Sequence, residues 1–499
     1  MNARPREPDA IELQLMLGAL HAACAEMGAL LIRAAHSPNI KERRDASSAL
    51  FDARGQMVMQ AEHIPVHLGA MPAALAAVID REQAPGRSWI LNDPFAGGTH
   101  LPDITVITPA HLDGRLIGFA ATRAHHADVG GRSAGSMPAD SRTLAEEGVV
   151  IAPQPFGEGE IERIVAPMRQ PAERRADLRA QLAANVVGAR RLEQLARRIG
   201  PKWLRDSLEA VLDYGERRAA AAIAALGDGV REASDIVEAP EGDLELRVRA
   251  TVAGSKMVLD FSGSAAQHPG NLNCPLAVTH SACYFAVRVL TDPETPPNAG
   301  AHRPLEVRAP EGSLLHARPG AAVAAGNVET SSRIADLVLA AFGRALGQGT
   351  MNNLTLGNER FSYYETIGGG QGACPDADGP SGVHVAMSNT LNTPVEALER
   401  AYPLRVVRSE RRRGSGGAGR FRGGDGIVRE LEALEPMEFS LIAERRRHPP
   451  RGAAGGGDGA RGADTLDGEP LPAKATGVLR AGSRLRIETP GGGGHGAAA

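Results

Sequence analysis

Three glycine-rich runs near the end of the chain restrict its fold more than any other feature. They read RGSGGAGRFRGGDG (413–426), RGAAGGGDGARG (451–462) and PGGGGHG (490–496). Glycine is a poor helix former because it loses the most backbone freedom on folding. Strand-like segments such as RELEALEPMEFSLIAE (429–444) lie between the runs. We therefore expect residues 406–499 to form a turn-rich, glycine-laced β region rather than a flexible tail.

The rest of the chain alternates helical and strand patterns. Apolar residues recur at helical spacing over 11–35, and the pattern stops before Pro38. Two antiparallel hairpins are predicted next, one turning near 53–55 and one at 113–114. Residues 173–226 are rich in Ala, Leu, Arg and Glu and favour two or three helices.

These patterns predict a mixed α/β (α+β), multidomain protein. A chain of 499 residues is long enough for several hydrophobic cores. Strand alternation returns after about residue 236, and the composition shifts to glycine beyond 411. We expect an N-terminal region with a long first helix and a helical segment over 1–235, a central α/β region over 236–405, and the β-rich region over 406–499.

Charge and cysteine content exclude several kinds of partner. The formal net charge is −4, with acidic and basic residues interspersed, so no field would gather nucleic acid or an anionic membrane. The cysteines at 24, 274, 283 and 374 lack metal-knuckle spacing and are predicted to be reduced, buried thiols. No signal-peptide pattern opens the chain, and we expect no membrane span. The prediction is a cytoplasmic protein without nucleic-acid or membrane partners.

Nucleotide-binding motifs are absent or lack their context. Residues 414–419, GSGGAG, fit the pattern GxGxxG, but they follow SERRR (409–413) instead of a buried strand. No GxxxxGK[ST] phosphate loop occurs in the chain. If the reaction uses ATP, we therefore expect the nucleotide to bind elsewhere than on this chain.

Two hydrolase motifs are also excluded. The segment EHIPVH (62–67) contains Pro65, which would break the helix that a zinc-protease motif needs. For His63 and His67, which flank this proline, ordinary loop contacts are the favoured interpretation. No GxSxG nucleophile elbow is present either.

The segment DPFAGGTHLPDIT (93–105) carries one histidine and two aspartates among glycines and prolines, between apolar runs. Pro102 favours extended backbone, in which residues three apart point the same way, so His100 and Asp103 should share a face. The glycines at 97 and 98 allow the backbone to pass close to a bound group. This arrangement indicates either a metal site or polar groups that cap turns.

A second polar segment, RAHHADVGG (123–131), ends a predicted strand. Strand alternation sends His125 and His126 to opposite faces, so only one of them should join His100 and Asp103. A His, Asp, His set with one further carboxylate suits a catalytic divalent cation with open positions for water and substrate.

These segments closely resemble signature segments of the hydantoinase B/oxoprolinase family, which includes acetone carboxylase alpha subunits. The resemblance runs nearly end to end. Further matching segments are SPNIKERRDASSALFD (37–52), EHIPVHLGAMP (62–72), DFSGSAAQHPGNLN (260–273), GNVETSSRIAD (326–336), YYETIGGGQGA (363–373), SNTLNTPVEALERAYP (388–403), GSGGAGRFRGGDGIVRE (414–430) and TPGGGGHG (489–496). One departure is RRDASSALFD (43–52), which more often reads Asp-Phe-Ser in the family.

The resemblance implies a division of labour between two subunits of a hetero-oligomer. A hydantoinase A-type partner would bind ATP and phosphorylate the carbonyl oxygen of a cyclic amide. This chain would then hold the metal centre where the activated substrate meets water. By position in the shared motifs, the implied ligands are His100, Asp103 and His125, with Asp45 as the fourth. Zinc, iron(II) and manganese(II) all suit such ligands.

Other residues and functions remain open beside this prediction. His126 and Asp128 are candidates for relaying protons or orienting a ligand, as carboxylates and histidines behind a metal site often do. An acetone carboxylase-like carboxylation of a small ketone would use the same fold and site. A non-catalytic scaffold subunit is the third alternative, but a scaffold would not need an intact set of ligands.

Overall fold

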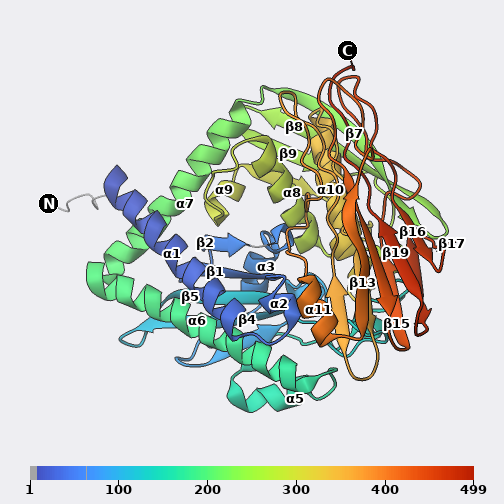
Figure 1. Ribbon diagram of the computed structural model, residues 1–499. Helices are drawn as coiled ribbons and strands as arrows, with labels where there is room; N and C mark the ends of the chain where they lie inside the picture. The colour runs from blue at the N-terminus through green and yellow to red at the C-terminus, as the bar shows by residue number, and fades with distance from the viewer. Residues whose placement is uncertain (1–7, 63, 499) are drawn as a thin grey trace.

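The computed structural model describes residues 8–62 and 64–498, and Figure 1 shows their arrangement. A six-stranded antiparallel sheet forms the N-terminal part, in the order β2-β1-β5-β4-β3-β6. Its strands are β1 (Ala46–Asp52), β2 (Met57–Glu62), β3 (Ser88–Leu91), β4 (Asp103–Leu112), β5 (Arg115–His125) and β6 (Gln154–Phe156). Asp113 and Gly114, between β4 and β5, have φ values of 48° and 76°, the left-handed pair that a tight hairpin requires. The two predicted hairpins are confirmed.

Three long helices cover one face of this sheet: α1 (Ala10–Ala34), α6 (Pro171–Ile199) and α7 (Pro201–Ala224). Leu50 and Ala120 point from the sheet into the core beneath them, together with Leu20 and Met27 of α1. Residues that alternate with these, such as Phe51 and Ala121, face the opposite side and pack against α3 (Ala70–Ala76). Both faces of the sheet are therefore buried, one against the three long helices and the other against α3.

The central part holds a four-stranded sheet, β10-β9-β8-β7, in which β9 and β10 are parallel. Its strands are β7 (Gly229–Ala239), β8 (Gly242–Ala253), β9 (Lys256–Asp260) and β10 (Leu305–Arg308). Helices α8 (Leu276–Leu290) and α10 (Ser331–Ala341) share its largely apolar core. A π-helix, η4 (Gly326–Thr330), leads directly into α10.

Two further sheets form the C-terminal part. The first, β12-β11-β15-β18, consists of β11 (Asn353–Gly357), β12 (Ser362–Glu365), β15 (Met437–Ile442) and β18 (Lys474–Leu479). The second, β13-β14-β19-β16-β17, consists of β13 (Leu404–Arg412), β14 (Gly426–Ala433), β16 (Ala463–Leu466), β17 (Glu469–Pro470) and β19 (Arg484–Glu488). β13 and β14 pair antiparallel on either side of residues 414–419, so no dinucleotide-binding βαβ unit surrounds that glycine motif.

Short helices complete the described chain. They are α2 (Pro38–Lys41), η1 (Pro65–His67), η2 (Pro94–Ala96), α4 (Leu144–Glu147), η3 (Glu158–Glu160), α5 (Ile161–Val165), α9 (Ala299–His302) and α11 (Val395–Ala401).

The glycine runs do more than form turns. They lie against one another as extended segments, with Gly417 donating to the carbonyl of Gly492 at 2.8 Å and Gly492 donating to that of Gly424 at 2.9 Å. A Cβ on Gly492 would lie 2.0 Å from the carbonyl oxygen of Gln371. Close backbone packing, which only glycine permits, therefore explains these runs better than turns alone.

The predicted fold class, mixed α/β (α+β) and multidomain, is confirmed. The three-part division at residues 235 and 405 stays a prediction. Cys24, Cys274 and Cys283 are buried as expected, whereas Cys374 is exposed. The expectation that no segment has the length and hydropathy of a membrane span is wrong for α1, where an 18-residue window has a mean hydropathy of 1.7. In this structure α1 packs on β1, β2 and α6.

Candidate metal centre

Strand register brings three of the predicted ligands to one end of the N-terminal sheet. Asp103, the first residue of β4, is paired directly with His125, the last residue of β5. Strand β1 runs along the other side of β5, and the amide of His125 donates to the carbonyl of Asp45 at 3.0 Å. Asp45, Asp103 and His125 therefore meet where three strands begin or end.

His100 reaches the same place from the loop before β4. The amide of Asp103 donates to the carbonyl of His100 at 3.1 Å, which closes a turn around Pro102. Nδ1 of His100 lies 3.0 Å from Oδ2 of Asp103. The predicted sharing of a face by these two side chains is present, although a turn brings them together, not a continuous extended segment.

His67 joins the cluster although it is not among the predicted ligands. Its Nε2 lies 3.4 Å from Oδ2 of Asp103, and its Nδ1 contacts the hydroxyl of Ser47 at 2.9 Å. One donor atom each from Asp45, His67 and Asp103 lie within 4.8 Å of one another. Two sequence signals cover His67: the family-like segment EHIPVHLGAMP (62–72), and EHIPVH (62–67) within it, which Pro65 excludes as a zinc-protease motif. His63, from the same motif, lies outside the described residues.

Several polar atoms of the cluster are buried without a hydrogen-bond partner among the described residues. Each of the five side chains is exposed by 2% or less. Oδ1 of Asp45, Nε2 of His100, Oδ1 of Asp103 and Nε2 of His125 have no such partner, whereas Nδ1 of His100 and Nε2 of His67 lie 3.0 and 3.4 Å from Oδ2 of Asp103. Buried polar groups are normally paired, so convergent orphan donors of this kind fit a bound cation.

The electrostatics of the cluster also fit a cation. Burial raises the pKa of Asp45 to about 7, and the nearby Asp103 carboxylate adds to this rise. Burial acts in the same direction on Asp103, but His100 and His67 outweigh it and hold the pKa of Asp103 well below its usual range. Burial lowers the pKa of His67 and, to a larger extent, that of His125. Neutral imidazoles beside an ionised carboxylate are the forms that bind metals.

The ring of His125 is fixed by its neighbours. The side-chain amide nitrogen of Asn39 lies 2.7 Å from Nδ1 of His125, and Nε2 of the same ring has no hydrogen-bond partner among the described residues. The Tyr364 ring stacks on the imidazole with 4.3 Å between centroids. Arg43 hydrogen-bonds the Asn39 side chain and lies 4.6 Å from the centroid of the Tyr364 ring. Such supporting contacts orient a ligand before any ion binds.

His126 and Asp128 are directed elsewhere. Nε2 of His126 contacts Oε1 of Gln181 on α6 at 3.0 Å, on the opposite face of the sheet from His125. Asp128 accepts hydrogen bonds from the amides of Gly130 and Gly135 and from Arg169. No hydrogen bond between described residues joins either side chain to the cluster. These contacts favour structural roles, and a proton relay through them stays a prediction.

Comparison with known proteins gives the family. The family model for hydantoinase B/oxoprolinase matches residues 9–498. The chain belongs to the hydantoinase B/oxoprolinase family, as its motifs predict.

Individual proteins of known name are similar to this chain over nearly its whole length. The 5-oxoprolinase 1 of Arabidopsis thaliana is 38% identical over a match that covers 98% of this chain and 42% of that protein. The chain thus spans about two fifths of the length of the 5-oxoprolinases it matches. The crystal structure of the ATP-dependent caprolactamase from Pseudomonas jessenii has a TM-score of 0.92 and 26% identity, covering 99% of this chain and 92% of that one. A nucleotide-free acetone carboxylase, at TM-score 0.86 and 18% identity over 98% of this chain and 76% of that one, shares the fold.

Proposed function

We propose that this chain is the B-type subunit of an ATP-dependent cyclic amidohydrolase. In this proposal it opens the ring of a hydantoin-, oxoproline- or lactam-like amide that a partner subunit has phosphorylated. The observation that carries the proposal is the buried His and Asp cluster with its orphan donor atoms, found in a chain of the oxoprolinase family. A structural protein would have little reason to bury so many unpaired polar atoms.

The proposed ligands are Asp45, His100, Asp103 and His125, with zinc, iron(II) or manganese(II) as the ion. When bound, such an ion lowers the pKa of a water molecule and polarises the oxygen of the substrate. The Asp103 carboxylate, anionic beside two histidines, supplies the negative charge that holds a cation in place. Asn39 and Tyr364 keep the His125 ring in position.

The proposal assigns ATP to a hydantoinase A-type partner in a hetero-oligomer. An amide is a poor electrophile, and transfer of a phosphoryl group from ATP to its oxygen leaves ADP and an activated imidate. Water then adds to the imidate carbon and the ring C–N bond breaks, which leaves an acyl phosphate and a free amine. A second water hydrolyses the acyl phosphate and releases inorganic phosphate and the ring-opened amino acid. The absence of a phosphate loop in this sequence agrees with ATP binding elsewhere.

Coexpression with an A-type subunit tests the proposal. We expect the complex to open a cyclic amide and hydrolyse ATP in equal amounts, while this chain alone shows no turnover. Asp103→Asn, which removes the charge at nearly constant shape, should abolish ring opening and metal content in the complex. Asp113→Asn, the same change at the exposed β4–β5 turn, is the matched control and should retain both. ATP-dependent ring opening by the isolated chain would contradict the assignment.

Carboxylation of a ketone is the competing function. The acetone carboxylase structure is 18% identical and therefore supports the shared fold alone. The same complex, supplied with acetone, bicarbonate and ATP, is expected to form no carboxylated product.

A further inference from the structure

Five arginine side chains of the described chain are buried almost completely, with an exposure of 1% or less. Three of them lie within ion-pair distance of a carboxylate, namely Arg174, Arg333 and Arg445. The other two, Arg43 and Arg123, have no carboxylate at such a distance among the described residues. A buried charge normally has a counter-charge close to it, because an unpaired one is costly. Both exceptions lie beside the candidate metal centre.

Arg43 donates hydrogen bonds to neutral acceptors. They are the side-chain oxygen of Asn39, the carbonyl of Tyr364 at 3.0 Å, and the hydroxyls of Thr366 at 2.7 Å and Thr390 at 3.0 Å. Asn39 and Tyr364 both contact the His125 ring. Asp45 of the cluster follows Arg43 by two positions in the sequence. The positive charge of Arg43 is therefore separated from the cluster by a single layer of side chains.

Arg123 approaches the cluster from β5. It lies two positions before His125, so the two side chains leave the same face of the strand. Its Nε donates to the hydroxyl of Thr105 at 2.7 Å, and Thr105 is its directly paired residue on β4. The guanidinium also donates to the carbonyl of Gly97 at 2.7 Å and to that of Ala70 at 3.3 Å. These acceptors are again neutral.

The charges of both arginines act on groups of the cluster. Burial lowers the pKa of Arg123 to about 10 and Asp103 opposes this change, so the guanidinium is charged at neutral pH. Burial lowers the pKa of His67, Asp103 raises it, and Arg123 lowers it again. Burial and Asp103 raise the pKa of Asp45, and Arg43 lowers it. Each arginine therefore acts electrostatically on the cluster without touching its carboxylates.

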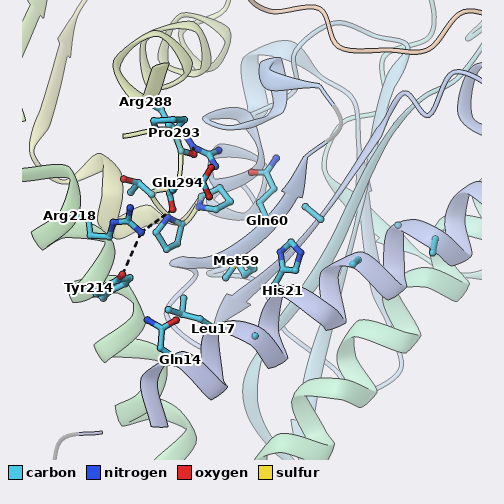
Figure 2. Close-up of a pocket in the computed structure, with 18 of the residues that line it drawn as sticks. Gln14, Leu17, His21, Met59, Gln60, Tyr214, Arg218, Arg288, Pro293 and Glu294 are labelled. Atoms are coloured by element: carbon cyan, nitrogen blue, oxygen red, sulfur yellow. Dashed lines mark hydrogen bonds between the residues drawn. The ribbon is translucent and has the colours of Figure 1, made fainter. Parts of the chain in front are cut away.

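Arginines near the surface differ from these two in both exposure and partners. Figure 2 shows Arg218 on the wall of the open cavity beside α1, where it donates to the Tyr214 hydroxyl at 3.5 Å and to the Glu294 carbonyl at 3.2 Å. Its side chain is 31% exposed and forms an ion pair with Asp292. Solvent and a counter-charge weaken the field of such a group. The two guanidinium groups beside the metal centre have neither.

The charges of the metal centre balance before any ion is bound. Asp45 and Asp103, when ionised, carry as much negative charge as Arg43 and Arg123 carry positive charge. Burial raises the pKa of Glu147, a further buried carboxyl group that interacts with the cluster, to about 7. Its carboxyl group is therefore only partly ionised at neutral pH. A bound divalent cation consequently adds positive charge that the surrounding protein does not compensate.

We propose that Arg43 and Arg123 make the metal centre select an anionic ligand together with its cation. They act as fixed positive charges in a region of low dielectric constant, where a charge several ångströms away still changes affinity strongly. The two arginines weaken the binding of the cation by itself and strengthen the binding of an anion to the cation. They are thus specificity-determining residues that do not touch the ligand. This inference rests on the proposed function for the presence of a divalent cation.

The affinity of the full chain for cobalt(II) tests this role with two variants of nearly equal shape. Thr105→Asp places the missing counter-charge beside Arg123, and Thr105→Asn makes the same change without the charge. We expect Thr105→Asp to bind cobalt(II) at least about tenfold more tightly than Thr105→Asn, as measured by competition with a chelator. Any defect of folding affects both variants alike. Equal affinities would overturn the proposal.

A second variant removes one of the charges. Arg123→Gln should also bind cobalt(II) more tightly than the wild type, a change that loss of a merely structural residue would not produce. Arg54→Gln, at an arginine whose side chain is 65% exposed, is the control and should bind cobalt(II) as the wild type does. Circular dichroism confirms that each variant is folded. Weaker cobalt binding in a folded Arg123→Gln protein would contradict the repulsion between this arginine and the cation.

Azide is a small anionic probe for the second half of the proposal. Titration of the cobalt(II)-loaded protein, followed by its visible absorption spectrum, gives the affinity for azide without any turnover. We expect azide to bind at least about tenfold more weakly to Thr105→Asp than to Thr105→Asn, and more weakly to Arg123→Gln than to the wild type. By linkage, azide should tighten the binding of cobalt(II) to the wild type by the same factor as cobalt(II) tightens that of azide. Equal azide affinities in these proteins would overturn the selection of anions.

The proposed function and this inference can fail separately. A protein that binds no divalent cation would contradict both. Cobalt(II) and azide affinities that are the same in the wild type and all three variants would remove the role of the two arginines and leave the metal centre in place. Absence of ring opening by the complex with an A-type subunit, with the expected cobalt(II) and azide affinities, would contradict the proposed function alone.

Discussion

Asp103 and His125 face each other as directly paired residues of β4 and β5. Asp45, the residue before β1, lies at the same end of the sheet. His126, one residue further, turns to the other face and contacts Gln181. The two adjacent histidines therefore belong to different environments. This separation makes the ligand assignment testable with a pair of neighbouring substitutions.

His125→Ala should abolish metal binding, and His126→Ala should leave metal content near that of the wild type. The reason is that Nε2 of His125 is an orphan atom in the cluster, whereas Nε2 of His126 is already engaged by Gln181. Elemental analysis of the purified variants measures the effect, with circular dichroism as the check on folding. The reverse order of metal loss would show that the wrong histidine has been assigned.

His67→Ala should weaken metal binding without eliminating it. His67 contacts Oδ2 of Asp103 and is itself held by Ser47, so it orients a ligand carboxylate. Removal of such a supporting contact typically costs about 10- to 100-fold in affinity. Competition with a chelator gives the affinity directly. Complete loss of metal, equal to that in His100→Ala, would instead make His67 a ligand.

Glu329→Gln should make the protein more stable above neutral pH. Burial, reinforced by the nearby Glu444, raises the pKa of Glu329 from about 4.5 to about 8. The folded state therefore holds a proton that the unfolded chain releases. The contribution of the protonated Glu329 to the free energy of unfolding is complete below pH 4.5 and is lost as the pH rises toward 8. Relative to the wild type, the variant should gain about 1 kcal/mol per pH unit across that window.

Denaturation midpoints of both proteins between pH 5 and 8.5 check this expectation. Glu359→Gln, at an exposed position, is the control and should follow the wild type at every pH. Parallel curves for Glu329→Gln and the wild type would show that Glu329 is ionised in the folded protein.

Gly492→Ala should destabilise the C-terminal part severely. The added Cβ would lie 2.0 Å from the carbonyl oxygen of Gln371, and backbone atoms cannot move aside as a flexible side chain would. We expect a loss of about 3 kcal/mol or failure to fold. Gly159→Ala is the matched control, since nothing lies within 4 Å of its Cβ and its φ is not left-handed. Equal melting temperatures for the two variants would contradict the close packing of the glycine runs.

The sequence by itself determined the local features of this protein. Periodicity located the long first helix and the turn at Asp113–Gly114, because these depend on a few neighbouring residues and on φ values that glycine tolerates. The motifs around His100 and Asp103 identified the family, and alternation along one strand separated His125 from His126. Each of these inferences rests on residues a few positions apart.

Only the tertiary structure decided which distant groups meet. His67 reaches Asp103 from a short helix 36 positions earlier, as the 3.4 Å contact shows, and no local pattern encodes that approach. Gln60 of the edge strand β2 is buried, and its side-chain amide has no hydrogen-bond partner among the described residues, near residues of α1, α7 and a loop around residue 293. The glycine runs, which predict turns when read alone, are needed because backbone segments remote in the sequence pack together without room for a Cβ. Such contacts depend on long-range packing, which the spacing of residues along the chain does not specify.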